Sequence, residues 1–226
     1  MKKQCKILIL FILIPFFGHA IDNDFLHSKE KNIKKAYYVN PDAILSIDNS
    51  YGTISVTTWN EDKIELDISI KVSGDNENWV NQRIETITVD IVALKGMITA
   101  KTVLENSNYK SQGKNNSFEI NYTLKIPKNG SVKLNNKYGN ISTSDLFAEA
   151  DIKCKYGKIT LGRLSGNSTI QMEYCSNSSI VFLKNGIVTA KYSNLKIGET
   201  TKLDLISDYT DIEIEQSDAI KYNSKY

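Results

Sequence analysis

The side chains that could carry out chemistry in this 226-residue chain are few. It has two histidines, His19 and His27, and only His27 follows the point at which we expect a signal peptide to be removed. Histidine-based triads and multi-histidine metal sites cannot be built from this one imidazole in a polar leader. We therefore expect no metal site, no cofactor and no histidine-dependent catalysis.

Three carboxylates lie close together in the second half of the sequence, at Asp145, Glu149 and Asp151. Enzymes that cleave polysaccharides gather such groups in one groove as general acid and base, often with a guanidinium beside them. The two arginines, Arg83 and Arg163, do not stand near a repeated row of charges. Solvation of the surface explains these carboxylates more simply. We predict a non-enzymatic protein and keep a polysaccharide lyase or hydrolase as the alternative.

A repeat of tyrosine residues is the most regular feature of the chain. The last part contains Tyr138, Tyr156, Tyr174, Tyr192, Tyr209 and Tyr226, at successive spacings of 18, 18, 18, 17 and 17 residues. An earlier copy, Tyr51-Gly52, lies 87 residues before Tyr138, and glycine follows the tyrosine again at Gly139 and Gly157. A fixed period of this length is typical of a unit that buries its apolar side only by stacking on copies of itself.

Within each repeat, apolar and polar residues alternate as they do in a β-strand. The position four residues before the tyrosine is occupied by Leu134, Ile152, Ile170, Val188, Leu205 and Tyr222. This alternation places each tyrosine on the same side as the apolar row, so we expect the rings to point inward. The alternation shifts by one residue just after the tyrosine, where glycine or another small residue would allow a tight corner. The Tyr174 repeat has Asn177 where isoleucine is expected, which predicts a bulge.

Two or three short strands separated by corners, within about 18 residues, describe one coil of a parallel β-solenoid. Neighbouring coils lie about 4.8 Å apart, so equivalent side chains form ladders. We expect the tyrosine ladder to fill a corner of the core. The alternative, an aromatic platform for sugar rings, requires tyrosines that face solvent. The row just before the tyrosines alternates in charge and should help to fix the register of the coils. It consists of Lys155, Glu173, Lys191, Asp208 and Lys225.

Two cysteines follow the expected signal peptide, Cys154 and Cys175. A disulfide is the usual expectation in an exported protein. The repeat, however, places them on neighbouring coils and three residues apart along the strand, which is about 10 Å and beyond the reach of a disulfide. We therefore predict two buried free thiols.

The residues before the repeats predict a β-rich part of a different kind, which begins with the first Tyr-Gly repeat unit. Strands are predicted at 64–72 and 118–126, and a hairpin within 87–104. A helix is predicted at 75–84, capped by Asp75. The polar residues 105–117 should form an exposed loop. The predicted fold is thus all-β: a parallel β-solenoid preceded by a β-rich segment with one short helix. The expected parts are a signal peptide (1–20), a polar leader (21–36), the amino-terminal β-rich part (37–130) and the solenoid repeats (131–226).

The first twenty residues are typical of a secretory signal peptide. Lys2, Lys3 and Lys6 precede an apolar run over residues 7–17, which is too short to span a hydrocarbon core of about 30 Å. Small residues favour cleavage after Ala20. We expect an exported chain, in the periplasm or at the cell surface, with no transmembrane segment.

The expected mature chain has almost no net charge. Removing three of the 28 Lys and Arg residues leaves 25 against 26 Asp and Glu, a net charge of −1. Because the two signs are interspersed, a nucleic-acid partner is disfavoured. The sequence stops at Tyr226, partway through a repeat, so we expect the last coil to continue in a longer protein or to meet a partner at its open edge.

Several short motifs resemble the bacterial "putative adhesin" domain family of the Bacteroidetes envelope. They are DNSYGTI at residues 48–54, LKIP at residues 124–127 and NKYGNI at residues 136–141, together with the serial Tyr-Gly-x-Ile units. The resemblance covers residues 37–226 and implies an exported β-solenoid, with no catalytic or ligand residues to carry over. We expect a non-catalytic envelope protein, an adhesin or interaction scaffold whose partner is an envelope protein, a glycan or another copy of itself.

Overall fold

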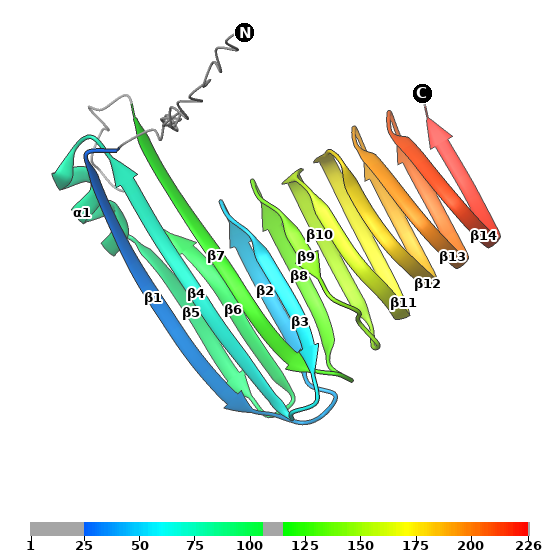
Figure 1. Cartoon of the computed structure of the whole chain (residues 1–226), viewed down its shortest axis with the longest axis horizontal. Helices are drawn as coiled ribbons and strands as arrows, with labels where there is room; N and C mark the ends of the chain where they lie inside the picture. The colour runs from blue at the N-terminus through cyan, green and yellow to red at the C-terminus, as the bar shows by residue number, and fades with distance from the viewer. Residues whose placement is uncertain (1–24, 106–114, 226) are drawn as a thin grey trace, which may run out of the picture.

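The structure, a computed structural model, describes residues 25–105 and 115–225. Strands dominate these residues, with a single helix, α1, in the described part of the chain (Figure 1). The elements of the amino-terminal part are β1 (His27–Tyr38), β2 (Ile44–Ser50), β3 (Ile54–Trp59), β4 (Lys63–Gly74), α1 (Glu77–Glu85), β5 (Ile87–Leu94), β6 (Met97–Leu104) and β7 (Asn116–Pro127). Those that follow are β8 (Ser131–Lys137), β9 (Ile141–Thr143), β10 (Ala150–Gly157), β11 (Ile159–Cys175), β12 (Ser178–Lys191), β13 (Asn194–Asp208) and β14 (Asp211–Lys225).

The carboxyl-terminal half is a parallel β-solenoid, as predicted. Each of the long strands β11 to β13 pairs in parallel with the next strand over nearly its whole length. The first half of β11 pairs with β9 and its second half pairs with β10. The two halves of this strand therefore belong to two successive coils of the solenoid, which we call rungs. Figure 1 shows these rungs following one another from the amino-terminal part to β14.

The Tyr51 segment is the first rung of the same stack. Strand β2 pairs in parallel with β8, with Ile47 opposite Leu134, and β3 pairs in parallel with β9, with Ile54 opposite Ile141. Segments 87 residues apart in sequence therefore lie side by side, because they carry the same motif. This rung is internal, since β6 covers β2 and β7 covers β3 on the side away from the solenoid. Paired strands therefore lie on both sides of the predicted boundary between the amino-terminal part (37–130) and the solenoid repeats (131–226).

The amino-terminal part is largely antiparallel. Strands β5 and β6 form the predicted hairpin, and β4 pairs with β7 and with β1. Helix α1 is one residue displaced from the prediction, because Asn76, not Asp75, is the N-cap and accepts a hydrogen bond from the backbone N–H of Trp79. Strand β1 departs from the prediction of a polar leader over residues 21–36. Its polar composition fits an edge strand that pairs on one side only, with β4. Most of the predicted loop 105–117 lies outside the described residues.

The apolar rows expected from the alternation form the core. The residues four positions before each tyrosine, from Leu134 to Leu205, are all buried, whereas Tyr222, the last member of the predicted row, is exposed. The second row, three residues after the tyrosine, is buried at Ile54, Ile141 and Ile159. At Tyr174 the predicted irregularity is present. Tyr156 lies five residues before Leu161, whereas Tyr174 lies six residues before its partner Ile180, and Asn177 takes a φ of 51°.

Candidate functional site

Each tyrosine of the repeat has a left-handed backbone. The φ angles of Tyr51, Tyr138, Tyr156, Tyr174, Tyr192 and Tyr209 lie between 47° and 63°. Apart from Asn177, they are the only non-glycine residues with positive φ in the described ranges. Such a conformation costs an L-residue roughly 1–2 kcal/mol. Its recurrence on six rungs shows that the corner of the coil is made at the tyrosine itself.

The tyrosine side chains face solvent, so the prediction that they point inward was wrong. Their exposed fractions range from 39% to 60%. The alternation of inward and outward side chains holds only while the backbone stays extended, and a positive φ turns the Cβ to the other side. The shift in alternation that the sequence showed therefore begins at the tyrosine and not at the residue after it. Tyr226, the seventh expected member, lies outside the described residues.

The predicted stacking of the rings is present. Ring centroids of neighbouring tyrosines lie 5.0–5.2 Å apart from Tyr51 to Tyr209. The four pairs from Tyr138 to Tyr209 are within 5° of parallel. A stacked aromatic pair contributes about 0.5–1.5 kcal/mol, which is of the same size as the cost of the left-handed backbone. We call these six residues the tyrosine ladder.

The ladder is closed at its amino-terminal end. Phe118 packs against Tyr51 with a centroid distance of 4.8 Å, and the guanidinium of Arg83 lies 4.5 Å from the centre of the Phe118 ring. Arg83 is held in place by hydrogen bonds to the carbonyl of Glu105 and the hydroxyl of Thr86. This arginine therefore supports the ladder and does not face a carboxylate site.

The glycines after the tyrosines allow neighbouring rungs to approach. A Cβ on Gly52 would overlap the carbonyl of Ile120, one on Gly139 the carbonyl of Gly52, and one on Gly157 the carbonyl of Gly139. On later rungs Cys175, Ser193 and Thr210 replace the glycine. There the side chains join the rungs by hydrogen bonds, in which Cys175 N–H donates to Ser193 Oγ and Ser193 N–H donates to Thr210 Oγ1.

The charged row before the tyrosines pairs across rungs, as its alternation predicted. Lys155 Nζ lies 3.0 Å from Glu173 Oε2, and Lys191 Nζ lies 3.2 Å from Asp208 Oδ2. Lys155 Nζ also lies 5.2 Å from the centre of the Tyr156 ring. The hydrogen bond to Glu173 raises the pKa of Lys155, so this ammonium stays charged beside the ladder.

Of the three carboxylates considered for catalysis, Glu149 is exposed, Asp145 is hydrogen-bonded to the backbone, and Asp151 has one buried oxygen. Asp145 Oδ1 accepts a hydrogen bond of 2.8 Å from the backbone N–H of Arg163, whose guanidinium lies 4.2 Å from the centre of the Phe182 ring. Asp151 Oδ1 is buried without a hydrogen-bond partner in the described structure. No group of three or more His, Cys, Asp or Glu residues that could hold a metal ion occurs among residues 25–105 and 115–225.

Cys154 and Cys175 are both free and buried, as predicted. They are closer than the spacing along the strand suggested, because each chain segment turns at its tyrosine. The Cys175 thiol donates to the carbonyl of Cys154, and the Cys154 thiol donates to the carbonyl of Gly139. The adjoining Cys175 thiol, together with burial, raises the pKa of Cys154.

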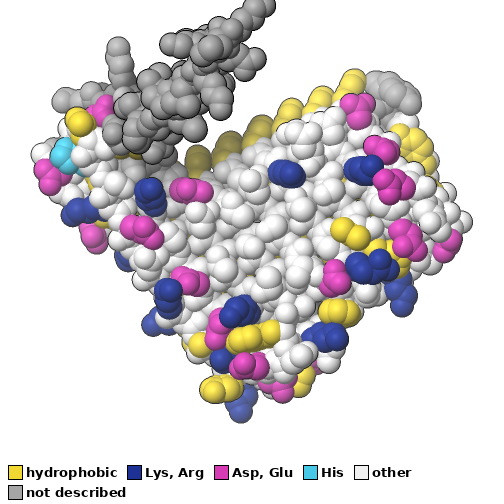
Figure 2. Space-filling view, in the orientation of Figure 1, with side chains coloured by type: hydrophobic (Ala, Val, Ile, Leu, Met, Phe, Trp, Pro, Cys, Tyr) yellow, Lys and Arg dark blue, Asp and Glu magenta, His cyan; other side chains and the backbone are white. Residues whose placement is uncertain are grey.

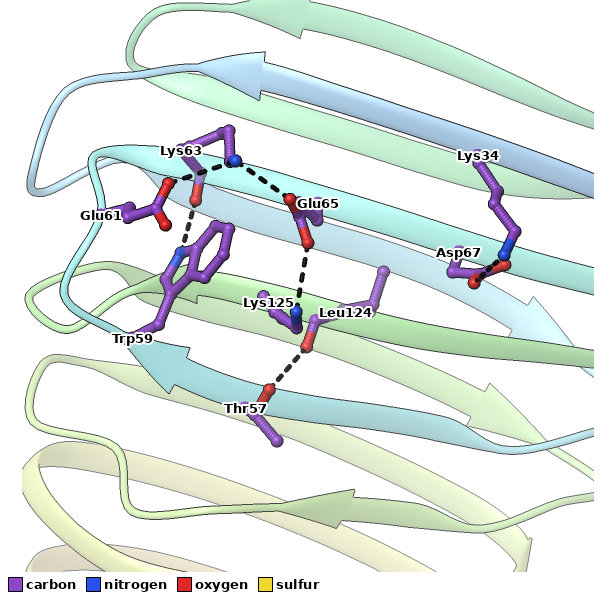
Figure 3. A network of polar contacts seen from close by, with 9 residues as sticks. All are labelled: Lys34, Thr57, Trp59, Glu61, Lys63, Glu65, Asp67, Leu124 and Lys125. Carbon is purple, nitrogen blue, oxygen red and sulfur yellow. Dashed lines mark hydrogen bonds and ion pairs between the residues drawn. The ribbon is translucent and has the colours of Figure 1, made fainter.

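A polar network near the end of β3 was not anticipated from the sequence (Figure 3). The indole N–H of Trp59 donates to the carbonyl of Lys63, and Lys63 Nζ contacts the carboxylates of Glu61 and Glu65. Glu65 also pairs with Lys125. The hydrogen bond from Lys63 lowers the pKa of Glu65. These polar groups are paired with one another, so we interpret the network as a structural connection between β3, β4 and β7.

Comparisons with known proteins give similarity in fold only. No family model and no curated protein matches the chain. Among solved structures, a "putative adhesin" from Bacteroides fragilis NCTC 9343 is similar, with 16% identity, a TM-score of 0.48, and coverage of 86% of this chain and 93% of that chain. A "putative adhesin" from Parabacteroides distasonis ATCC 8503 has 9% identity, a TM-score of 0.27, and coverage of 86% and 94%. A "putative lipid binding protein" from the same strain has 11% identity, a TM-score of 0.28, and coverage of 86% and 97%.

Proposed function

We propose that the protein is an exported, non-catalytic binding protein of the cell envelope, and that the tyrosine ladder is its binding surface. The observation that carries this proposal is the ladder itself, six exposed rings stacked one on the next. In Figure 2 hydrophobic side chains form a row along the upper edge of the solenoid, above the rungs labelled in Figure 1. Tyrosine is enriched where proteins bind partners, because its ring provides contact area and its hydroxyl provides a hydrogen bond.

The ladder is also organised before any partner arrives. Each inner ring is held between two neighbours, so little side-chain freedom is lost on binding, and this loss is a main cost of association. Export is inferred from the signal-peptide pattern of residues 1–20. No helix in the described part of the chain is long and apolar enough to cross a membrane.

The test is a pelleting assay with bacterial envelope fractions, that is, membranes and peptidoglycan sacculi. The protein is purified after export from a bacterial host, and mass spectrometry of its amino terminus checks cleavage after Ala20. We expect the wild type to pellet with one fraction and a Tyr138→Ser, Tyr156→Ser, Tyr174→Ser variant to stay in solution. A matched control replaces three exposed hydrophobic residues elsewhere, Tyr38, Val92 and Leu94, by serine.

Equal pelleting of the ladder variant and the wild type would refute the ladder as the binding surface. The non-catalytic part is tested separately, by assaying for new reducing ends or unsaturated products with a panel of polysaccharides. Product formation that disappears in Asp145→Ala would replace this proposal by the glycan-cleaving alternative.

A further inference from the structure

The ladder has a shape that fits a linear polymer. Its rings advance in nearly equal steps of 5.0–5.2 Å from Tyr51 to Tyr209, one ring stacked on the next. The step is the spacing of adjacent strands, about 4.8 Å, and one sugar unit of an extended polysaccharide is of similar length. A linear glycan can therefore present equivalent groups to successive rungs.

The exposed parts of the ladder are polar as well as aromatic. The inner rings cover one another's faces, so their edges and hydroxyl groups meet solvent. In the described structure none of the six hydroxyl groups is hydrogen-bonded to protein, whereas the buried Tyr122 hydroxyl is paired with Thr102. A row of free hydroxyl groups favours a partner that is rich in hydrogen-bonding groups, such as a carbohydrate, over an apolar one.

Two rungs of the ladder are flanked by lysine without acidic residues. The outward positions flanking Tyr138 and Tyr156 hold Lys137, Lys153, Lys155 and Lys158. None of the corresponding positions on these two rungs is acidic. Only Lys155 among these lysines is paired with a carboxylate in the part of the chain that the structure describes, and that carboxylate, Glu173, belongs to the next rung. The rung of Tyr209, by contrast, is flanked by Asp208 and Asp211.

Three of these lysines, Lys137, Lys153 and Lys155, line a groove. It runs across the outward side of the rungs and is lined by Asn135, Lys137, Lys153, Lys155, Gln171 and Glu173, among others. The amides of Asn135 and Gln171 add donors and acceptors between the ammonium groups. Lys155 Nζ lies 5.2 Å from the centre of the Tyr156 ring, which joins this groove to the ladder. The carboxylate in the lining, Glu173, is paired with Lys155, so the ammonium groups of Lys137 and Lys153 and the two amides are complementary to carboxylates spaced along a sugar chain.

We propose that the ladder binds a linear acidic polysaccharide, with uronate carboxylates at the lysines of the Tyr138 and Tyr156 rungs and the chain running along the stack. This inference rests on the proposed function and names the class of partner. Neutral glycans lack the charge that the three unpaired lysines would meet. A sulfated glycan would present the same negative charge on a different group, and a neutral partner or a protein is an outcome that the test can return.

Binding is measured by isothermal titration with polygalacturonate, chondroitin sulfate and dextran. We expect polygalacturonate to bind, dextran not to bind, and the affinity to fall as salt is raised because exposed ion pairs are screened. With galacturonate oligomers of increasing length, the affinity should rise until the oligomer covers the rungs of Tyr138 and Tyr156 and should then level off, because Glu173, Asp208 and Asp211 flank later rungs. Chondroitin sulfate binding more tightly than polygalacturonate would assign the site to sulfate and overturn the uronate assignment.

Two sets of variants decide which residues act. Lys137→Gln, Lys153→Gln and Lys158→Gln together should weaken polygalacturonate binding about tenfold or more. The matched control, Lys29→Gln, Lys35→Gln and Lys71→Gln, makes the same change in charge on β1 and β4 and should leave binding unchanged. Equal weakening by both sets would show attraction by net charge alone and would overturn the proposed site.

The failures of the two proposals can be told apart. If envelope fractions bind through the tyrosines while polygalacturonate does not bind, the acidic polysaccharide is wrong and the proposed function stands. If polygalacturonate binds equally well to the serine variant of Tyr138, Tyr156 and Tyr174, the acidic polysaccharide is bound elsewhere and the ladder is wrong as the binding surface. Thermal unfolding of each variant checks that a loss of binding is not a loss of folding.

Discussion

At each corner of the solenoid, two adjacent residues have different tasks. The tyrosine makes the turn with its left-handed backbone, and the residue after it lies against the neighbouring rung. Stacking explains why tyrosine can occupy a position that glycine or asparagine would normally take. An isolated tyrosine at such a φ would carry the full cost of about 1–2 kcal/mol, whereas each ring in the ladder gains contacts with two others.

The glycine position gives the first prediction. Gly139→Ala should lower the free energy of unfolding by more than about 2 kcal/mol, because the new methyl group overlaps the carbonyl of Gly52 and only a backbone shift can relieve it. Urea unfolding followed by circular dichroism measures the change. Gly96→Ala is the matched control, since the nearest heavy atom to its Cβ would be 3.9 Å away. Equal midpoints for the two variants would show that the rungs can separate without cost.

At the scale of the elements, a buried hydrogen-bond network joins β2, β6 and β7. The Tyr122 hydroxyl is paired with Thr102 Oγ1 at 2.7 Å, and Thr102 Oγ1 donates to Asn49 Oδ1 at 2.8 Å. The Asn49 amide then donates to the carbonyl of Ile120. Burial raises the pKa of Tyr122 to about 12, while the Thr102 hydrogen bond opposes the shift. The network therefore requires the neutral phenol.

This shift predicts a dependence of stability on pH. The folded pKa of Tyr122 is raised above its usual 10, so its contribution is complete below pH 10 and is lost as the pH rises through about 12. The loss is roughly 2–3 kcal/mol. Tyr122→Phe should be about 1 kcal/mol less stable at pH 8, through the lost hydrogen bond, and should lose less stability than the wild type above pH 10. Urea titrations from pH 8 to 11.5 measure this, with Tyr38→Phe as the exposed control. Parallel curves for the wild type and Tyr122→Phe would contradict it.

The sequence was informative about the elements and less so about the corners. Period-two alternation located β4, β7 and the β5–β6 hairpin, the tyrosine spacing predicted parallel rungs, and the repeated Tyr-Gly motif marked the Tyr51 segment as a first coil or an edge rung. The direction of the tyrosines could not be read from alternation, because that pattern assumes an extended backbone and one positive φ reverses it. A shift in alternation locates a corner only to within a residue or two. The lysine groove was missed for the same reason, because it can form a binding site with the tyrosine rings only if those rings face solvent.

At the scale of the whole molecule, the fold is a stack in which each rung depends on its neighbours. The amino-terminal end is covered by α1, β1 and the β5–β6 hairpin, whereas among the described residues β14 pairs with β13 alone. The residues of β14 are largely exposed, including Ile220 and Tyr222. In such a quasi-one-dimensional stack, stability is a sum of rung and interface contributions, and a rung with one interface opens more easily than a rung with two.

Amide hydrogen exchange tests this gradient along the stack. In the 226-residue chain, peptides from β14 should exchange much faster than peptides from β12, because opening β14 breaks one interface while opening β12 breaks two. Strand β13 should be intermediate, and the Tyr51 rung, which is covered on both sides, should be among the slowest. Mass spectrometry of the exchanging protein at micromolar and at tenfold higher concentration separates folding from association. Protection of β14 equal to that of β12 at both concentrations would contradict the stack, whereas protection that appears only at high concentration would show that the edge pairs with another copy.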